Sequence, residues 1–264
     1  MNRREFLAGT AALSTLGLAQ ESKTADSNVA QDQYKRIKGD APVIAMIIYP
    51  EFTALDLIGA YQFFWAIMTH RVILVSKKSG IVRADTGLGV MSEATFKTCP
   101  KNIDAIFLPG GTNGTVSAMK DKETIDFIKR AAPNCKLVTS VCTGSLILGA
   151  AGLLKGKKAT SHWLAHETLA DFGAIPVKER VVRDGNILTG AGVSASLDLG
   201  LEVVQSLSGE DYAKVCQLFF EYDPKPKFDC GSPEKAPAAD VEMCRAMIPQ
   251  FILDVKAVAK GVSR

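Results

Sequence analysis

The sequence VIAMIIY at positions 43–49 is an unbroken apolar run of strand length, and Pro50 ends it. A strand that is apolar on both faces is typical of a parallel sheet covered on both sides by helices. Further along, a helix is expected at 55–68 and strands at 71–76, 105–108 and 136–141. This alternation predicts an α/β fold, in which a doubly wound, mostly parallel sheet is flanked by helices. Functional residues of such folds lie at the carboxyl ends of the strands.

The second half of the chain contains a hairpin and further helices. Positions 181–189 read VVRDGNILT, in which Asp-Gly between two short apolar strands predicts a tight hairpin. A helix is expected at 194–207, and residues 222–239, rich in Pro, Lys and Asp, are expected to be extended. A last helix at 241–259 should be kinked by Pro249.

The composition is that of an ordinary soluble globular protein. Of the 264 residues, 47% are hydrophobic and 22% are charged, and 31 Lys and Arg stand against 28 Asp and Glu. These values exclude a disordered chain, a collagen and a bundle of membrane helices. A formal charge of +3, with basic residues evenly scattered, disfavours a nucleic-acid surface and a polybasic membrane patch. We therefore expect a small, roughly neutral substrate, no nucleic acid partner and no stable membrane insertion.

The first residues resemble an export signal. Positions 2–7 read NRREFL, and an uncharged, mildly apolar run follows up to Ala19. About 20 apolar residues are needed to span a bilayer, so this run is too short for a membrane helix. Paired arginines before a weakly apolar region resemble a twin-arginine signal at 1–19, which predicts cleavage after Ala19 and export to the periplasm by the Tat machinery. The alternative is an amphipathic N-terminal helix.

A linker and one domain are expected to follow the signal. Residues 20–42 are polar and lack apolar periodicity, which is typical of a linker. No internal repeat is visible after it. The rest of the chain, residues 43–264, is therefore predicted to be one domain that includes the last helix.

The six cysteines lie at irregular spacings, with no Cys-x-x-Cys pair. This spacing disfavours zinc, haem and thioredoxin-type chemistry. An even number of cysteines in an exported protein permits disulfides, and Cys230 with Cys244 is the candidate pair.

The three histidines offer little to a metal ion. His162 and His166 are four residues apart and could share one face of a helix, but no third ligand is obvious near them in the sequence. We therefore expect no metal site. His70, at the end of the first helix, is expected to be solvated.

Cys142 is the candidate nucleophile. It follows the apolar strand at 136–141 and precedes Thr143-Gly144, where a helix can begin, so the thiol would stand on a strand-to-helix turn of the nucleophile-elbow type. Backbone N–H groups and the positive end of a helix stabilise a thiolate there, which predicts a lowered thiol pKa. The alternative is a buried structural cysteine. A dyad of Cys142 with His162 is also compatible with the sequence.

Two further segments end at the same edge of the predicted sheet. Positions 109–112 read PGGT, and Gly110 and Gly111 would let backbone N–H groups approach a reacting atom, as an oxyanion site requires. The alternative is an ordinary strand-to-loop turn. Asp56 lies among apolar residues just after the first strand, where burial would raise its pKa and let it donate or share a proton. Its alternative role is to stabilise the first turn of the helix.

Three segments carry a family resemblance. They read AIFLPGG at 105–111, VTSVCTGSLILGAAGLL at 138–154 and ATSHW at 159–163. With these motifs the chain resembles the ThiJ/PfpI superfamily of glutamine-amidotransferase-like proteins over residues 43–239. The resemblance implies a flavodoxin-like α/β fold.

Within this superfamily the sequence most resembles the isocyanide (isonitrile) hydratases. The residues that carry this likeness are LDL at 55–57, Cys142-Thr143, ERVVRDGN at 179–186, and the segment from Glu221-Tyr222 through Phe228 to Gly231-Ser232-Pro233. PfpI proteases place His after the nucleophile, where this chain has Thr143, and many relatives carry Glu at the position of Asp56. Both differences point away from peptidase and glyoxalase activities.

The resemblance implies a lyase that hydrates an isocyanide to an N-formamide without a cofactor. Cys142 would attack the terminal carbon to form a thioimidate. Asp56 would protonate the intermediate and activate water, Thr143 would position Asp56 or the sulfur, and the Gly111 N–H would hold the reacting group. The resemblance also implies a homodimer with the active site near the subunit interface. The hydratases that it resembles are cytoplasmic, in contrast to the export signal expected for this chain.

Other functions of the same residues stay open. A glyoxalase-like or amidase-like enzyme could act through Cys142. A non-enzymatic redox sensor or protective protein would instead use oxidation of this thiol.

Overall fold

The structure is a computed structural model that describes residue 37 and residues 39–262. The expected export signal at 1–19, its cleavage site after Ala19 and most of the linker at 20–42 lie outside the described residues, so they stay predictions. Within the described part, no helix is both long enough and apolar enough to cross a membrane.

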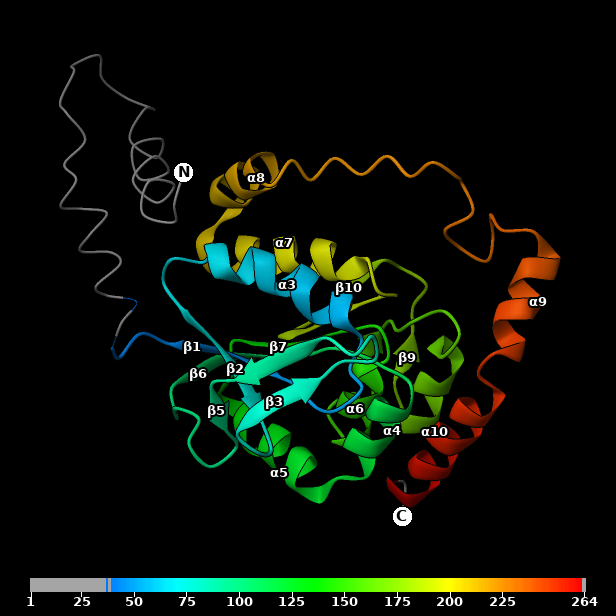
Figure 1. Cartoon of the computed structure of the whole chain (residues 1–264), viewed down its shortest axis with the longest axis horizontal. Helices are drawn as coiled ribbons and strands as arrows, with labels where there is room; N and C mark the ends of the chain where they lie inside the picture. The colour runs from blue at the N-terminus through cyan, green and yellow to red at the C-terminus, as the bar shows by residue number, and fades with distance from the viewer. Residues whose placement is uncertain (1–36, 38, 263–264) are drawn as a thin grey trace.

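A seven-stranded sheet forms the centre of the molecule (Figure 1). Its strand order is β10-β11-β7-β6-β1-β2-β5, and every neighbouring pair is parallel except β10 with β11. The strands are β1 (Val43–Ile47), β2 (Arg71–Ser76), β5 (Ala94–Thr95), β6 (Ile103–Leu108), β7 (Leu137–Val141), β10 (Val181–Asp184) and β11 (Ile187–Gly190). All five residues of β1 are completely buried, as its apolar run predicted.

Helices cover both faces of this sheet, which confirms the doubly wound α/β prediction (Figure 1). One face carries α3 (Ala54–Ala66), α7 (Ala195–Ser208) and α8 (Glu210–Phe219). The other face carries α4 (Asn113–Lys120), α5 (Lys122–Ala131), α6 (Gly144–Ala150), the 3₁₀ helix η2 (His166–Phe172) and α10 (Pro249–Val262). Gly200 lets α7 approach α3 closely, because a Cβ there would lie 2.8 Å from Cβ of Phe63.

The smaller elements lie at the edges of these layers. They are the hairpin β3 (Gly80–Arg83) and β4 (Gly89–Ser92), the pair β8 (Lys158–Ala159) and β9 (Ile175–Pro176), and the 3₁₀ helix η1 (Ala132–Asn134). The β10–β11 hairpin around Asp184-Gly185 is confirmed. Residues 222–237 contain no helix or strand, as expected, and carry the chain from α8 across to α9 (Ala238–Ala246) (Figure 1).

The prediction of one kinked C-terminal helix is wrong. The chain forms two helices, α9 and α10, and Pro249 is the first residue of α10. Proline lacks an N–H to donate within a helix, but the first residue of a helix needs none. Pro249 therefore starts a new helix.

The candidate pair Cys230 and Cys244 does not form a disulfide, because all six cysteines are free. Cys230 is exposed in the extended segment and Cys244 lies on α9. The extended segment and the helix do not bring the two sulfur atoms together.

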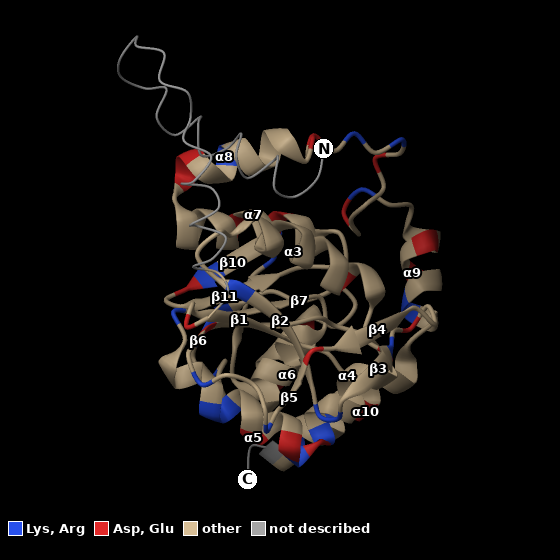
Figure 2. Cartoon of the chain, turned by 60° about the vertical axis from the view of Figure 1, so that its left-hand side comes forward, with Lys and Arg blue, Asp and Glu red and all other residues tan. Residues whose placement is uncertain are grey.

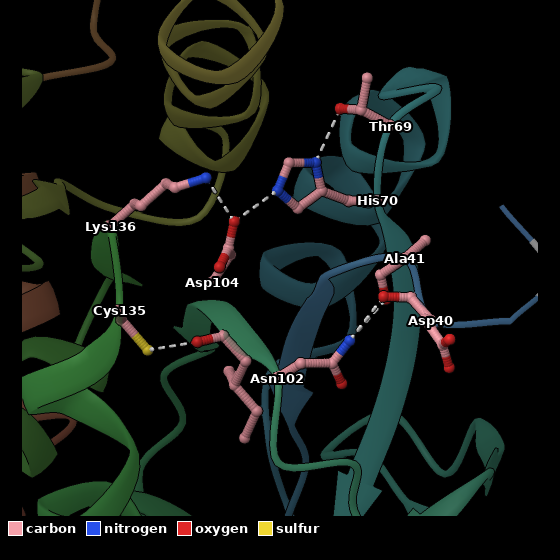
Figure 3. A network of polar contacts seen from close by, with 9 residues as sticks. Asp40, Ala41, Thr69, His70, Asn102, Asp104, Cys135 and Lys136 are labelled. Atoms are coloured by element: carbon pink, nitrogen blue, oxygen red, sulfur yellow. Dashed lines mark hydrogen bonds and ion pairs between the residues drawn. The ribbon is translucent and has the colours of Figure 1, made fainter. Parts of the chain in front are cut away.

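His70 is buried, with 6% of its surface exposed, rather than solvated. Its Nε2 lies 3.3 Å from Asp104 Oδ2, and its Nδ1 lies 2.8 Å from Thr69 Oγ1 (Figure 3). Lys136 Nζ pairs with the same Asp104 oxygen at 2.7 Å. Asp104, near the start of β6, and Lys136, just before β7, lie next to the start of β2. These segments are far apart in the sequence, so no local pattern predicts the contact. Burial lowers the pKa of His70, although Asp104 acts in the opposite direction.

We predict that His70→Gln is more stable relative to the wild type at pH 5.5 than at pH 7.5. Because the pKa of His70 is lower in the folded protein than in the unfolded chain, the unfolded chain binds more protons at this group, and protonation of His70 destabilises the wild type as pH falls. Glutamine does not titrate. Urea unfolding at both pH values tests this, and equal pH dependence in the two proteins would contradict it.

Candidate active site

Cys142 lies on the turn between β7 and α6, with a left-handed φ of 58°. Such a conformation is strained for a non-glycine residue and is typical of a nucleophile elbow, which confirms the predicted turn. The surrounding chain holds it: the Cys142 N–H donates to Ala191 O at 2.7 Å, and Cys142 O accepts from Ser161 Oγ at 3.0 Å. The residue is 5% exposed, so the thiol is fixed in a nearly closed site.

Two glycines allow this turn to pack against β6. A Cβ on Gly144 would lie 2.4 Å from Leu108 O, and a Cβ on Gly110 would lie 2.5 Å from the Thr143 nitrogen and 2.9 Å from Cys142 Cβ. Both contacts are too close for any side chain. The PGGT turn and the elbow are therefore pressed together at the carboxyl ends of β6 and β7.

Asp56 reaches this point from the first turn of α3 and is completely buried. Its Oδ2 accepts the N–H of Gly110 at 2.7 Å, and its Oδ1 is buried and accepts no hydrogen bond from a nitrogen or oxygen donor. Burial raises the pKa of Asp56 to about 7, against the hydrogen bonds of Gly110 and Cys142, which lower it. The negative charge of Asp85 raises it further. The carboxyl is thus buried with a raised pKa, as predicted, and it interacts with the Cys142 side chain, whereas proton sharing by Asp56 stays a prediction.

The pKa of the Cys142 thiol is raised well above its usual value, first by burial and then by the charge of Asp56. The expectation of a lowered thiol pKa is therefore wrong in its net direction. Hydrogen bonds from the Thr143 backbone and side chain do lower it, but burial and the carboxylate outweigh them. The resting thiol keeps its proton, and Asp56 is the group that can accept it.

The amides of Gly110 and Gly111 both have partners in this structure. The Gly110 N–H donates to Asp56, and the Gly111 N–H donates to Thr143 Oγ1 at 2.9 Å. Thr143 Oγ1 donates in turn to Gly111 O at 2.6 Å. These glycines therefore orient Asp56 and Thr143, and a direct contact of the Gly111 N–H with a reacting molecule stays a prediction.

The sequence analysis missed two residues that belong to this site. Tyr49 donates its hydroxyl to Pro109 O at 2.7 Å and lies 3.2 Å from Thr115 Oγ1. Thr115 Oγ1 lies 2.9 Å from Thr143 Oγ1. A hydroxyl at the end of the apolar run was a visible signal for Tyr49, but no sequence pattern singled out Thr115 on α4.

His162 and His166 are not part of the site around Cys142. His162 Nδ1 accepts from the Leu164 N–H at 3.3 Å, and no hydrogen bond links His162 to Cys142, so the dyad is not formed. His162 also precedes η2, which begins at His166, so the two histidines do not share one helix. In residues 37 and 39–262 there is no group of three or more His, Cys, Asp or Glu that could hold a metal ion.

The chain is similar in sequence and in structure to several known proteins. Residues 43–206 match the DJ-1/PfpI family. The isonitrile hydratase of Pseudomonas putida is 48% identical over 202 residues, which cover 76% of this chain and 88% of that protein. Among solved structures, a ThiJ/PfpI family protein from Pseudomonas syringae superposes with a TM-score of 0.81 at 43% identity and covers 93% of this chain and 99% of that one. Drosophila melanogaster DJ-1beta, at 18% identity and a TM-score of 0.63, covers 69% of this chain and 98% of that one, and shares the fold.

We predict that Asp56→Asn removes a pH-dependent loss of stability. The folded-state pKa of Asp56, about 7, lies above the unfolded value of 3.8, so the folded protein holds the proton more tightly. Raising the pH from 5 to 8 therefore costs the wild type roughly 3 kcal/mol through this group, at 1.36 kcal/mol per pKa unit. Asparagine stays neutral and keeps an oxygen for the Gly110 N–H. Urea unfolding at pH 5 and pH 8 measures the difference, and parallel changes in both proteins would refute it.

Proposed function

Since this chain belongs to the DJ-1/PfpI family, we propose that it is an isocyanide hydratase, which adds water to a small isocyanide to give an N-formamide. The observation that carries the proposal is the buried pair of Cys142 and Asp56, found in a chain that is closely similar to an isonitrile hydratase. An isocyanide is neutral and compact, which agrees with the expected small, roughly neutral substrate.

In the first half of the reaction the thiol adds to the terminal carbon. Asp56 takes the proton of Cys142 as the sulfur forms its bond to that carbon, and the same carboxyl then delivers the proton to the carbon. The product is a thioimidate, in which the carbon carries one hydrogen, the sulfur and a double bond to nitrogen. Asp56 is again a carboxylate, ready to act as a base.

In the second half Asp56 activates a water molecule. The water oxygen bonds to the thioimidate carbon while one water proton passes to Asp56, which delivers it to the nitrogen. The hydroxyl of this intermediate then gives its proton through Asp56 to the sulfur as the carbon–sulfur bond breaks, and the N-formamide leaves. One water is consumed, and no redox step or cofactor is required.

A raised thiol pKa favours this reaction over a redox role. Redox-sensor cysteines are typically acidic and accessible, whereas Cys142 is buried beside a carboxylate that opposes ionisation. A glyoxalase-like or amidase-like enzyme would use the same cysteine, and turnover of a dicarbonyl or an amide would reveal it.

We also propose a homodimer in which a second copy covers α3 and α8. Asp56 is the sole charged residue of α3, and it is buried. Leu55 and Ile58 on α3 are 46% and 45% exposed, and Leu218 on α8 is 83% exposed. In the view of Figure 2, α3 and α7 show few charged residues, whereas basic and acidic residues are interspersed around α5. Because Leu55 adjoins Asp56, a partner on this face would lie near the active site.

We predict that Cys142→Ala abolishes formamide formation from a simple alkyl isocyanide, because no sulfur remains to form the thioimidate. Asp56→Asn should lower turnover by about 10² to 10⁴, the usual contribution of a general acid and base, while leaving Cys142 alkylatable. Infrared or chromatographic detection of the formamide measures both, with protein that begins at Gln20.

Cys230→Ala is the matched control for this experiment, because Cys230 is an exposed free cysteine outside the site. It should keep full activity. Formamide production by Cys142→Ala would refute the mechanism. An inactive wild type whose Cys142 still reacts with iodoacetamide would instead indicate a different thiol enzyme.

We predict that the protein sediments as a dimer and that Leu218→Lys weakens this dimer at least tenfold, because a charge would be buried in an apolar contact. Ile81→Lys, at a 61% exposed apolar residue on β3, is the matched control and should sediment as the wild type does. Sedimentation velocity over a concentration series tests this. A monomeric wild type would exclude the dimer, and a fully dimeric Leu218→Lys protein would exclude this face.

A further inference from the structure

A chain of three buried hydroxyls leads from the end of β1 to the nucleophile elbow. Tyr49, Thr115 and Thr143 are 6%, 0% and 5% exposed. The Tyr49 oxygen lies 3.2 Å from Thr115 Oγ1, which lies 2.9 Å from Thr143 Oγ1. The Thr143 hydroxyl also interacts with the Cys142 sulfur and lowers the thiol pKa there. Thr115 is thus one hydrogen bond away from the group that contacts the sulfur.

Counting protons limits how this chain can be arranged, because each hydroxyl has one proton and two lone pairs. The Tyr49 proton goes to Pro109 O at 2.7 Å, since a carbonyl oxygen can only accept. One lone pair of Thr143 Oγ1 is taken by the Gly111 N–H. The other lone pair faces Thr115, whose proton can point either to Thr143 or to Tyr49.

The direction of the Thr143 proton depends on the charge of Cys142. With a neutral thiol, Thr143 donates to Gly111 O at 2.6 Å. When the thiol gives up its proton, the strongest acceptor in reach becomes the sulfur, because hydrogen bonds to charged groups are the stronger ones. Thr143 can turn its proton there and still have both lone pairs occupied if Thr115 donates to it.

We propose that Thr115 is a positioning residue for the nucleophile: its hydroxyl donates to Thr143 Oγ1 and thereby directs the Thr143 proton to the Cys142 sulfur as the thiolate forms. The inference rests on the proposed function in one respect, which is that Cys142 is the nucleophile. The donation polarises the Thr143 hydroxyl and strengthens its bond to the charged sulfur. Tyr49 anchors the chain at Pro109 and supplies no proton to it.

Other ionisable groups also act on the thiol and must stay constant in any test. Asp56 on α3 faces the sulfur directly, and Tyr49, at the end of β1, also interacts with it. Asp85, after β3, acts through Asp56. Thr115 carries no charge, so its replacement leaves all three in place.

The test uses Thr115→Val, which keeps the shape of the side chain and removes the hydroxyl. The rate of iodoacetamide labelling at Cys142 is followed by peptide mass spectrometry across pH, which separates this thiol from the other five cysteines. We expect the labelling midpoint to move to higher pH by about one unit and the rate at pH 8 to fall roughly tenfold, the effect of weakening one hydrogen bond to a charged group. Formamide turnover should fall similarly, with KM unchanged within about twofold.

Conservative and matched variants separate this role from simple packing. Thr115→Ser should restore both rates to within about twofold, because it restores the hydroxyl. Thr168→Val removes another buried threonine hydroxyl, which donates to Ala165 O at 2.7 Å on η2, and should leave the Cys142 profile unchanged. Thr115→Ala is the second hydroxyl-free variant if the valine protein does not fold.

An unchanged labelling profile in folded Thr115→Val or Thr115→Ala protein would overturn the proposal. An equal shift in Thr168→Val would do so too, because it would indicate general loosening of the fold. The labelling assay uses no isocyanide, so its outcome is separate from that of the hydratase assay. A shifted profile in a protein that makes no formamide would support the hydroxyl chain and remove the proposed function.

Discussion

The left-handed backbone at Cys142 is the constraint on which the rest of the site depends. A residue with φ of 58° costs strain, so its neighbours must hold it from several sides. The Cys142 N–H donates to the β11 edge and Cys142 O accepts from Ser161, while Gly144 and Gly110 have no side chains that would prevent the close approach. Once the elbow is fixed, Asp56 and Thr143 are fixed too, because the PGGT turn that packs against the elbow supplies their partners.

Several of these features follow from local sequence. The fully buried β1, the elbow at Cys142 and the buried carboxyl at Asp56 were predicted because each depends on a few consecutive residues and their apolar neighbours. The PGGT turn was predicted for the same reason, although its amides serve Asp56 and Thr143 in the structure.

The features that sequence reasoning missed depend on contacts between distant segments. His70 is buried because the starts of β6 and β7 bring Asp104 and Lys136 to it. Thr115 reaches Thr143 because α4 packs beside the elbow. A single threonine in a helix forms no sequence pattern that could have identified it. The thiol pKa was predicted in the wrong direction because the turn was visible in the sequence, whereas the depth of burial and the charge of Asp56 were not.

The raised pKa values of Cys142 and Asp56 suit an addition reaction better than a substitution. In a substitution the sulfur must only be ionised, and a lowered thiol pKa serves that need. Hydration of an isocyanide requires the terminal carbon to gain both a sulfur and a proton, so a pair that stores one proton beside the carbon is useful. Burial keeps that proton on the pair near neutral pH, since it disfavours both the thiolate and the carboxylate. In the proposed arrangement, Thr115 donates to Thr143, which stabilises the thiolate while the sulfur is charged. The thiol pKa stays high enough that the proton is not released to solvent.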